Sequence, residues 1–391
     1  MTIPAVPLVD VAVPKGLIGG PFGSSLVNND YEPSGVPVIR GTNLGFGRRL
    51  GGDYAFVSEE KVASDLARNT AAPGDIVFTQ RGTLGQVALV PDDTYPVFIV
   101  SQSQMRLRVD PAKAVSEYVY YACSSEAFIK QIDDNAISTG VPHINLGILN
   151  RLTIPLPPLP EQRAIAEVLG ALDDKIAANT KLITRLDAHM ALEYTAAVAE
   201  GALDSPLAAV AEFHNRRRVP LSAREREQRA GDIPYYGASG VFGTVNEAIF
   251  DEPLVLVGED GSVINADGTP VVQYIWGPAW INNHAHVLTG KDISTELLYL
   301  AITRCQVATL VTGAVQPKIN MGNLKRLVLE LPLAGDRGRL EAIVRAETAS
   351  KRAALEENVT LAATRDALLP QLMSGKLRVR DAEAVLEKAG V

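Results

Sequence analysis

Two long segments of the chain carry apolar residues at the spacing of a helix that packs along a partner helix. In the first segment, residues 156–200, these positions alternate in steps of four and three, which is the a/d seam of a coiled coil. Asn179 is polar at one of them, and a single asparagine in a seam fixes the register of the two helices. The predicted seam consists of Ile165, Leu169, Leu172, Ile176, Asn179, Ile183 and Leu186.

The second segment, residues 336–391, repeats the pattern less clearly. Asn358, Leu361 and Leu368 keep the phase, but charged residues, among them Lys351, interrupt the apolar stripe. We expect the two segments to pair as an antiparallel coiled coil. The alternative is a long helix packed on its own domain, but so narrow a stripe favours a helical partner.

The rest of the chain consists of short apolar runs that predict strands. The runs are rich in Val, Ile and Phe, and Gly or Pro bounds them. They lie in residues 1–155 and 201–335, so we expect an α+β fold with two strand-rich domains and two long helices. The runs are VPVIRG, DIVFTQRG, QVALVP, VFIVSQ and MRLRV in the first region, and PLVLVGEDGSV, VVQYIW and WINNHAHVL in the second.

The two halves of the chain resemble each other. Residues 139–152, TGVPHINLGILNRL, match residues 312–327, TGAVQPKINMGNLKRL, once two extra residues are allowed in the second copy. The weaker match of PLVDVA at Pro7 to PLAAVA at Pro206 would mark where the copies begin. Matches that keep their order indicate a duplicated unit.

Two further matches share one offset. Glu117 in EYVYYA corresponds to Glu296 in ELLYLA, because 296 − 117 = 179. Asn179 corresponds to Asn358 at the same offset, because 358 − 179 = 179. Each copy is therefore expected to contain a strand-rich region followed by a long helix.

Composition narrows the class of protein. The chain has 391 residues, 47% of them hydrophobic and 21% charged, which is typical of soluble globular proteins with more than one domain. It has no run long and apolar enough to span a bilayer and no basic start of a secretory signal, so we expect a cytoplasmic protein. Cys123 and Cys305 have no further ligands at metal-site spacing, which predicts two small buried side chains rather than a zinc site or disulfide.

Several blocks resemble the specificity (S, or HsdS) subunits of type I restriction-modification systems. The blocks are LPPLPEQRAIAEVLGALDDKIAANTKL, LAATRDALLPQLMSGKLRV, GDIVFTQRGTLGQVALVP and PKINMGNLKRL, and the resemblance covers nearly the whole chain with its duplication. It implies two target recognition domains separated by two long helices in an antiparallel coiled coil. Each domain would read one half of a bipartite DNA site. In the second copy ELPLAGDRGRLEAI replaces PLPPLPEQRAIAEV, which puts the symmetry of the two docking surfaces in doubt.

The resemblance also implies the partners. The helices would dock two methyltransferase (M) subunits, and restriction (R) subunits would join where they are present. The partners would use S-adenosylmethionine, and ATP with magnesium for restriction, whereas this chain would bind no cofactor and catalyse nothing. A complex that only methylates remains an equal interpretation of the sequence.

Base reading requires side chains with paired donors and acceptors on loops or strands that enter a groove. Arg suits guanine, and Asn or Gln suits adenine. In the first domain such side chains cluster in loops bounded by Gly, where turn formation is the alternative role. The candidates are Arg40, Thr42, Asn43, Gln80, Arg81, Thr83, Gln102, Ser103 and Gln104, with Thr139 and His143 just before the first helix.

The second domain offers a different set of candidates. Glu259 and Asp260 would be repelled by phosphate, but a carboxylate can accept a hydrogen bond from the cytosine amino group. A solvated turn is the alternative for both. The candidates are Tyr235, Tyr236, Ser239, Glu259, Asp260, Ser262, His284 and Lys318, with Arg216, Arg217 and Arg218 as phosphate contacts in the one basic cluster, which could also be a solvated loop.

Catalytic motifs are weak, and the charge leaves a competing function open. The Gly-rich stretches at Gly19 and Gly258 lack the Lys of a phosphate-binding loop, and His284 and His286 lack a third metal ligand. We therefore expect no catalytic residue and no metal site. The net charge of −8 argues against a free DNA-binding domain and favours either local basic faces or a coiled-coil scaffold whose ends bind protein.

Overall fold

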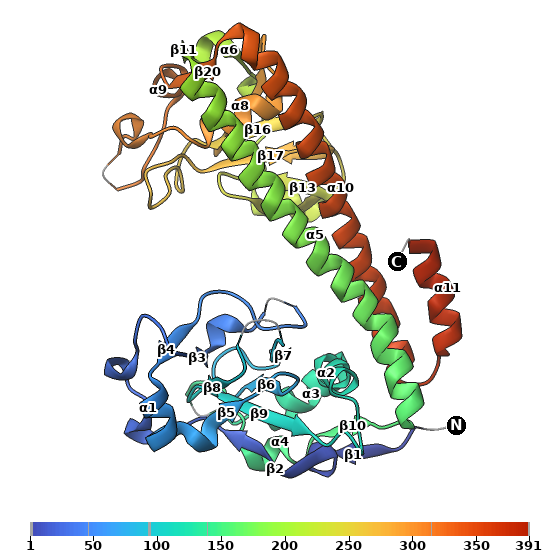
Figure 1. Cartoon of the computed structure of the whole chain (residues 1–391). Helices are drawn as coiled ribbons and strands as arrows, with labels where there is room; N and C mark the ends of the chain where they lie inside the picture. Colours follow the sequence, from blue (N-terminus) through green and yellow to red (C-terminus); the bar gives the residue numbers. More distant parts are fainter. Residues whose placement is uncertain (1–2, 46, 93–94, 139, 314, 390–391) are drawn as a thin grey trace. The chain divides into compact units, whose positions relative to one another are not determined.

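The computed structural model describes residues 3–45, 47–92, 95–138, 140–313 and 315–389 (Figure 1). The chain forms two compact units. Unit 1 comprises Met1–Asn179 and Glu356–Val391, and unit 2 comprises Thr180–Leu355. Each unit therefore holds one strand-rich region and a part of both long helices.

Unit 1 contains two four-stranded sheets. The first has the order β2-β9-β6-β7, and all neighbouring strands in it are antiparallel. The second has the order β4-β3-β8-β5, with a parallel pair, β3 and β8, in its centre. The strands are β2 (Ala12–Gly19), β3 (Val36–Ile39), β4 (Ala55–Val57), β5 (Thr70–Ala71), β6 (Ile76–Thr79), β7 (Val87–Leu89), β8 (Phe98–Val100) and β9 (Gln104–Val109).

Unit 2 repeats this topology strand for strand. Its sheets have the orders β12-β19-β16-β17 and β14-β13-β18-β15, and β13 and β18 are again a parallel pair. The predicted duplication is thereby confirmed. The strands are β12 (Ala211–Phe213), β13 (Ile233–Tyr236), β14 (Val241–Val245), β15 (Phe250–Asp251), β16 (Leu254–Gly258), β17 (Val272–Ile275), β18 (Pro278–Ile281) and β19 (Ala285–Gly290).

A two-stranded pair closes each strand-rich region. β1 (Ala5–Pro7) pairs with β10 (Thr153–Pro155), and β11 (Ala202–Pro206) pairs with β20 (Val328–Pro332). The leucine that follows the first strand of each pair donates its N–H to a carbonyl near the end of the same strand-rich region. Leu8 donates to the Leu152 carbonyl at 2.9 Å, and Leu207 donates to the Leu327 carbonyl at 2.7 Å. These equivalent bonds support the weak match between Pro7 and Pro206.

Short helices connect the strands and follow the second long helix, and two of them explain the repeated I-N-x-G motif. Asn145 and Asn320 are N-cap residues whose side chains accept from the N–H groups of Ile148 and Asn323, each at 2.9 Å. The short helices are α1 (Glu59–Lys61), α2 (Ser116–Ser124), α3 (Glu126–Asn135), α4 (Leu146–Leu149), α6 (Leu207–Val210), α7 (Ala223–Gln228), α8 (Thr295–Ile302), α9 (Met321–Lys325) and α11 (Val379–Ala389).

The long helices α5 (Leu159–Glu200) and α10 (Ala334–Met373) run antiparallel to each other inside each unit. In unit 1, Asp173 pairs with Arg365 at 2.7 Å, and in unit 2, Asp187 pairs with Lys351 at 2.7 Å, so positions rise along α5 as they fall along α10. The predicted antiparallel coiled coil is confirmed. The charged residues that interrupt the α10 stripe are not defects, because they form ion pairs with α5.

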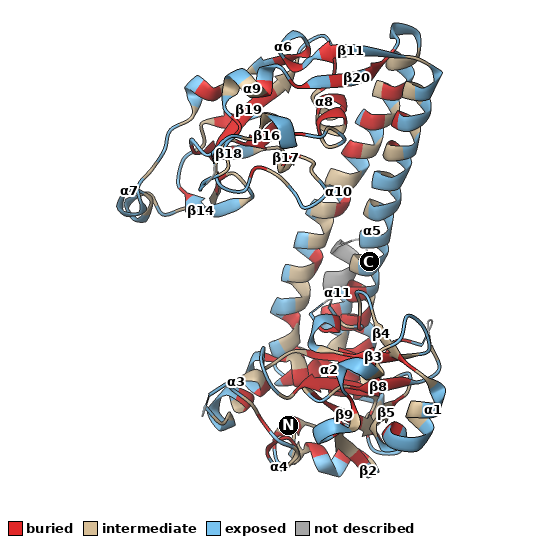
Figure 2. Cartoon of the chain, turned by 90° about the vertical axis from the view of Figure 1, so that its left-hand side faces the viewer, coloured by how far each residue is buried: buried red, intermediate tan, exposed pale blue. Residues whose placement is uncertain are grey.

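Burial along the helices shows that α5 packs against both α10 and the globular parts. Figure 2 shows buried positions along the helices and in the sheets. The first turns of α5 belong to the core of unit 1, and Met190 and Tyr194 belong to that of unit 2, so the alternative of a helix packed on its own domain is realised as well. Of the predicted seam residues, Ile165, Leu169, Leu172, Asn179, Leu361 and Leu368 are buried, and Ile176, Ile183, Leu186 and Asn358 are half-buried.

Two expectations need correction. The run WINNHAHVL is not one strand but the end of β18 and the start of β19, joined by a turn in which the His284 N–H donates to Asn282 Oδ1 at 2.8 Å. Cys123 is buried as expected, but Cys305 is half-exposed because it lines a cavity of unit 2.

Candidate nucleic-acid interface

In unit 1, the loop after β6 holds Gln80 and Arg81 against two other loops. The N–H groups of Gln80 and Arg81 donate to the Ser103 carbonyl at 2.7 and 3.4 Å, and the Ile144 N–H donates to the Gln80 carbonyl at 2.9 Å. Arg81 also forms a β-bridge with His143. The structure thus brings together three segments whose candidate residues are far apart in the sequence. Thr139 lies outside the described residues.

The side chains where these segments meet differ in exposure and in hydrogen bonding. Arg81 and Thr83 are exposed and Gln80 is half-buried, and within the described part of the chain none of the three side chains has a hydrogen bond or ion pair. His143 is half-buried, with Nδ1 3.2 Å from the Val141 carbonyl. Arg81 is therefore the candidate best placed to donate to a ligand.

The loop after β3 is shaped by Asn43. Its side chain is buried, donates to the carbonyls of Gly51 and Asp53 at 3.0 and 3.1 Å, and accepts from the Arg40 N–H at 3.0 Å. Arg40 is half-buried, and its Nη2 lies 3.5 Å from the Asp53 carbonyl. Thr42 is exposed. Asn43 is thus engaged in holding the loop, whereas Thr42 faces solvent.

The segment between β8 and β9 is likewise divided between support and surface. Gln104 is fully buried and accepts from the Ser101 hydroxyl. Gln102 is exposed at the surface, but its Nε2 donates to the carbonyls of Gly23 and Leu26, both at 2.9 Å. Ser103 contributes its carbonyl to the Gln80–Arg81 contact.

In unit 2 the equivalent three segments contact one another, but they carry different side chains. The Glu259 N–H donates to the His284 carbonyl at 2.8 Å, and the Ile319 N–H donates to the Glu259 carbonyl at 2.9 Å. Asp260 forms a β-bridge with Lys318, as Arg81 does with His143. We call the two adjacent residues at this position the loop pair of their unit. The loop pair is Gln80–Arg81 in unit 1 and Glu259–Asp260 in unit 2.

The sequence carries a signal for this equivalence, although we did not predict the equivalence from it. The offset of 179 residues that relates Asn179 to Asn358 also relates Gln80 to Glu259, because 259 − 80 = 179. The next glycines, Gly82 and Gly261, both have positive φ, 101° and 81°, which favours glycine at this turn. Extending the offset from the helices into the loops would have found it.

The loop pair of unit 2 is acidic, whereas that of unit 1 carries an arginine. Glu259 Oε2 lies 2.7 Å from Arg218 Nη1, and Glu259 Oε1 lies 3.5 Å from Lys318 Nζ. Asp260 pairs with His284. Burial lowers the pKa of His286, which lies 3.6 Å from Glu259 Oε2, so that contact involves a neutral ring at neutral pH. Glu259 is thus paired with two cations of its own unit, and Asp260 is held by His284.

The tyrosines and serines near this loop pair also divide into support and surface. Tyr235 is buried, and its hydroxyl accepts from the Leu221 N–H at 3.0 Å. Tyr236 is half-buried, and burial raises the pKa of its hydroxyl. Ser239 and Ser262 are exposed.

The arginine cluster is less free than its sequence suggests. Arg217 pairs with Glu252 at 2.6 Å and lies over the Phe250 ring, and Arg218 pairs with Glu259. Arg226 lies over the Tyr235 ring, and Arg229 pairs with Glu247 at 3.2 Å. Among the described residues, the guanidinium groups of Arg216 and Arg224 have no such partner, and both are exposed.

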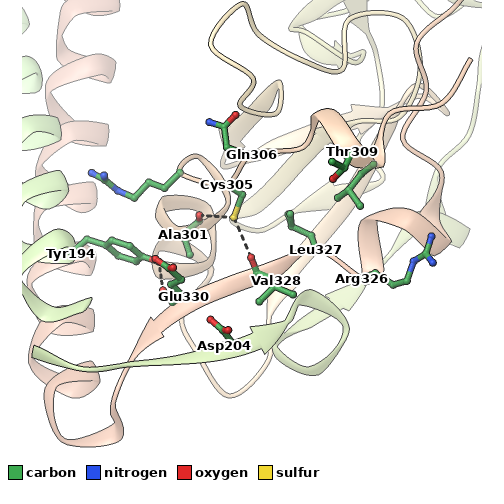
Figure 3. A pocket seen from close by; sticks show the side chains of 12 residues that line it. Tyr194, Asp204, Ala301, Cys305, Gln306, Thr309, Arg326, Leu327, Val328 and Glu330 are labelled. Atoms are coloured by element: carbon green, nitrogen blue, oxygen red, sulfur yellow. Dashed lines mark hydrogen bonds between the residues drawn. The ribbon is translucent and has the colours of Figure 1, made fainter. Parts of the chain in front are cut away.

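A cavity of about 540 Å³ lies elsewhere in unit 2 and contains none of the predicted site residues (Figure 3). The Cys305 Sγ in its wall lies 3.4 Å from the Ala301 carbonyl oxygen and 3.6 Å from that of Val328, so its single proton can be donated to either. Burial raises the pKa of Cys305 to about 11, so the thiol is protonated at neutral pH. The described residues include neither three or more His, Cys, Asp or Glu side chains grouped as for a metal ion, nor a helix apolar and long enough to cross a membrane.

Comparison with known proteins gives consistent matches. At the level of sequence, the chain is 30% identical over 128 residues to S.HindORF215P, a candidate type I restriction enzyme specificity subunit of Haemophilus influenzae. This alignment covers 32% of each of the two chains. It is 28% identical over 157 residues to the specificity subunit of the type I restriction enzyme MjaVIII of Methanocaldococcus jannaschii, which covers 39% of this chain and 36% of the relative. The chain thus aligns with only about a third of each relative's length.

The fold and the family model give broader matches. The S subunit of a type I restriction-modification system from M. genitalium has the same fold, with a TM-score of 0.63 over 95% of this chain and 99% of that one, at 19% identity. The family model of the type I restriction modification DNA specificity domain matches residues 24–188 and again residues 204–339. Two matches that together span most of the chain, one to each copy of the repeat, show that it belongs to the type I restriction-modification DNA specificity family.

Proposed function

We propose that this chain is the DNA specificity subunit of a type I restriction-modification complex, which binds a bipartite duplex site and directs its partner subunits to it. The family supports a specificity role, and one structural observation carries the proposal. Two units of identical topology present the same loop with different chemistry, Gln80–Arg81 in unit 1 and Glu259–Asp260 in unit 2. Duplicated readers with different side chains are what two unlike half-sites require.

The proposed base contacts of unit 1 follow from which side chains are free. In unit 1, Arg81 would donate to guanine and Gln80 to adenine, and the exposed Thr42 and Thr83 are the further proposed contacts. In unit 2, Asp260 is paired with His284 through Oδ1, and its Oδ2 would accept from a cytosine amino group. Ser239, Ser262 and Lys318 are the other proposed contacts of this unit. Arg216 and Arg224 would contact phosphate. Asn43, Gln104 and Tyr235 would act indirectly, because their side chains are buried.

We assign target recognition domains to residues 1–155 and 201–335, and the coiled-coil spacer to residues 156–200 and 336–391. The spacer would dock two methyltransferase subunits, joined by restriction subunits where these are present. S-adenosylmethionine, and ATP with magnesium for restriction, would be bound by the partners, and this chain would carry out no chemistry. Partner subunits would also supply part of the phosphate contact, given the net charge of −8.

The test is methylation mapping by single-molecule sequencing. The gene is expressed with and without its neighbouring methyltransferase gene in a host that has no other methyltransferase. The expected result is a new bipartite motif that requires both genes. A soluble complex that neither methylates nor binds duplex DNA in a salt-dependent manner contradicts the proposal and favours a protein-binding scaffold.

A further inference from the structure

The loop after β2 presents an aromatic side chain to solvent. Phe22, in the stretch GGPFGSS, is 88% exposed, more than any other aromatic residue that the structure describes. A phenylalanine left in water forgoes the favourable free energy of burial, roughly 1.5–3 kcal/mol for a fully buried side chain. This stretch is not a phosphate-binding loop, so its glycines and its aromatic residue require another explanation.

The loop that carries Phe22 is firmly attached. Gln102 Nε2 donates to the carbonyls of Gly23 and Leu26 on the far side of Phe22, both at 2.9 Å. On the near side, the Gly20 N–H donates to the Gln104 carbonyl at 3.0 Å, and Asn69 Nδ2 donates to the Gly19 carbonyl at 2.9 Å. Phe22 therefore projects from a loop fastened at both ends.

Glycine is required where this loop begins. A Cβ added to Gly20 would lie 1.9 Å from the Ser101 carbonyl oxygen, which no side chain tolerates. The close approach holds the loop against residues 101–104. The same segment supplies the Ser103 carbonyl that accepts from Gln80 and Arg81. The loop that carries Phe22 and the loop pair of unit 1 are thus both fixed to residues 101–104, and Gln80 Oε1 lies 3.9 Å from the point that a Cβ on Gly19, at the start of the Phe22 loop, would occupy.

We propose that Phe22 is a specificity-determining residue that contacts the methyl group of a thymine in the half-site read by unit 1. This inference rests on the proposed function. A single ring among polar readers is too small for a protein interface, but it matches the one apolar group that bases display in the major groove, the C5-methyl of thymine. Arg81 and Gln80 would read neighbouring bases in the same groove.

Unit 2 lacks this device. Its segment after β12 is His214–Arg218, and it carries arginines in place of the aromatic residue. Its exposed aromatic, Phe242, belongs to β14 instead. Only the half-site read by unit 1 should therefore depend on a thymine methyl group through Phe22.

The test is a double-mutant cycle between Phe22 and thymine methyl groups. The chain is assembled with its methyltransferase, and competition binding is measured on duplexes of the mapped motif in which each thymine is replaced in turn by deoxyuridine, which removes only the methyl group. For the wild type, one replacement in the half-site of unit 1 should weaken binding about fourfold, the value for one buried methyl group. Phe22→Ala should bind the unmodified duplex at least as weakly as the wild type binds the uridine duplex. The same replacement should not change the affinity of Phe22→Ala.

Matched controls separate the outcomes. Phe242→Ala removes a ring of unit 2 that is 68% exposed and should keep the full uridine effect in the first half-site. Urea unfolding of Phe22→Ala should match the wild type, because an exposed side chain contributes little to stability. If the wild-type complex binds no duplex specifically, the proposed function fails. If it binds but Phe22→Ala retains every uridine effect, or the half-site has no such effect, the thymine contact is wrong.

Discussion

Asn179 and Asn358 meet through their side chains, with Asn179 Nδ2 donating to Asn358 Oδ1 at 3.0 Å. They are also equivalent residues of the two copies, because the repeat offset is 179. In an antiparallel pair of helices that carry the same sequence pattern, equivalent residues can meet at one level only. The hydrogen bond therefore marks the level at which α5 and α10 are in equivalent register.

The direction of this hydrogen bond gives the first prediction. Asn179 Nδ2 also donates to Glu357 Oε2 at 2.6 Å, so Asn179→Asp removes both donors and sets a carboxylate against Glu357. We expect a loss of roughly 2–3 kcal/mol in the free energy of unfolding, measured with urea. Asn358→Asp keeps an acceptor for Asn179 and should lose at most about 1 kcal/mol. Equal losses in the two variants would contradict the assigned direction.

Two ion pairs between the long helices should differ in value. Asp173 is buried and is held by Arg365 at 2.7 Å and by the Tyr121 hydroxyl at 2.6 Å. Arg365→Met leaves this carboxylate without its cation, so we expect a loss of about 3 kcal/mol in urea unfolding. Lys351→Met breaks the more exposed pair with Asp187 and should cost at most about 1 kcal/mol. A larger loss from Lys351→Met than from Arg365→Met would mean that the burial of an ion pair does not determine its contribution to the free energy of unfolding.

The sequence predicted most of the framework, because periodicity reports which face of an element is buried. The a/d spacing found both long helices, and the repeat predicted two units of one topology. The parallel pairing of β3 with β8 was beyond reach, because short apolar runs do not say which neighbours they pair with. The ionic partners of Lys351 and Arg365 were also hidden, since they lie on the other helix and far away in sequence.

The candidate site was predicted less well than the fold, for a physical reason. An asparagine or glutamine in a loop bounded by Gly can serve a ligand or the loop itself, and composition does not distinguish the two. Asn43 and Gln104 are buried in internal contacts, whereas Arg81 is free. Phe22 was overlooked because exposure of an aromatic residue can be recognised only in a folded chain.

Protonation of His286 should weaken unit 2. The ring is buried, with Nε2 donating to the Ile319 carbonyl at 2.7 Å and Nδ1 2.8 Å from Asn215 Nδ2. Burial lowers its pKa below 6.5, so below that pH the unfolded chain binds the extra proton more readily than the folded chain does. The free energy of unfolding should therefore fall as the pH drops from about 7.5 to about 5.5. His286→Gln, which cannot titrate, should show a smaller fall, and an unchanged fall would exclude His286 as the source.

The loop pair predicts separable effects on the two half-sites. Arg81→Ala should relax one position of the half-site read by unit 1, at a cost of about 1–3 kcal/mol in binding, and leave the other half-site intact. Asp260→Ala should do the reverse. Methylation mapping of both variants decides this, because each motif can be compared with that of the wild type. Changes in both half-sites from either variant would show that the loop pair acts on overall binding rather than on base reading.

Cys305 should be unreactive even though it is half-exposed. Its pKa is raised to about 11 by burial, and the thiolate is the species that alkylating reagents attack. In a Cys123→Ser background, which leaves Cys305 as the one cysteine, alkylation by iodoacetamide at about pH 8 should be at least tenfold slower than in urea-unfolded chain. The rate in the folded chain should keep rising with pH beyond the range in which an ordinary thiol levels off. A folded-state rate equal to the unfolded one would mean that the cavity of unit 2 does not hold the thiol in its protonated form.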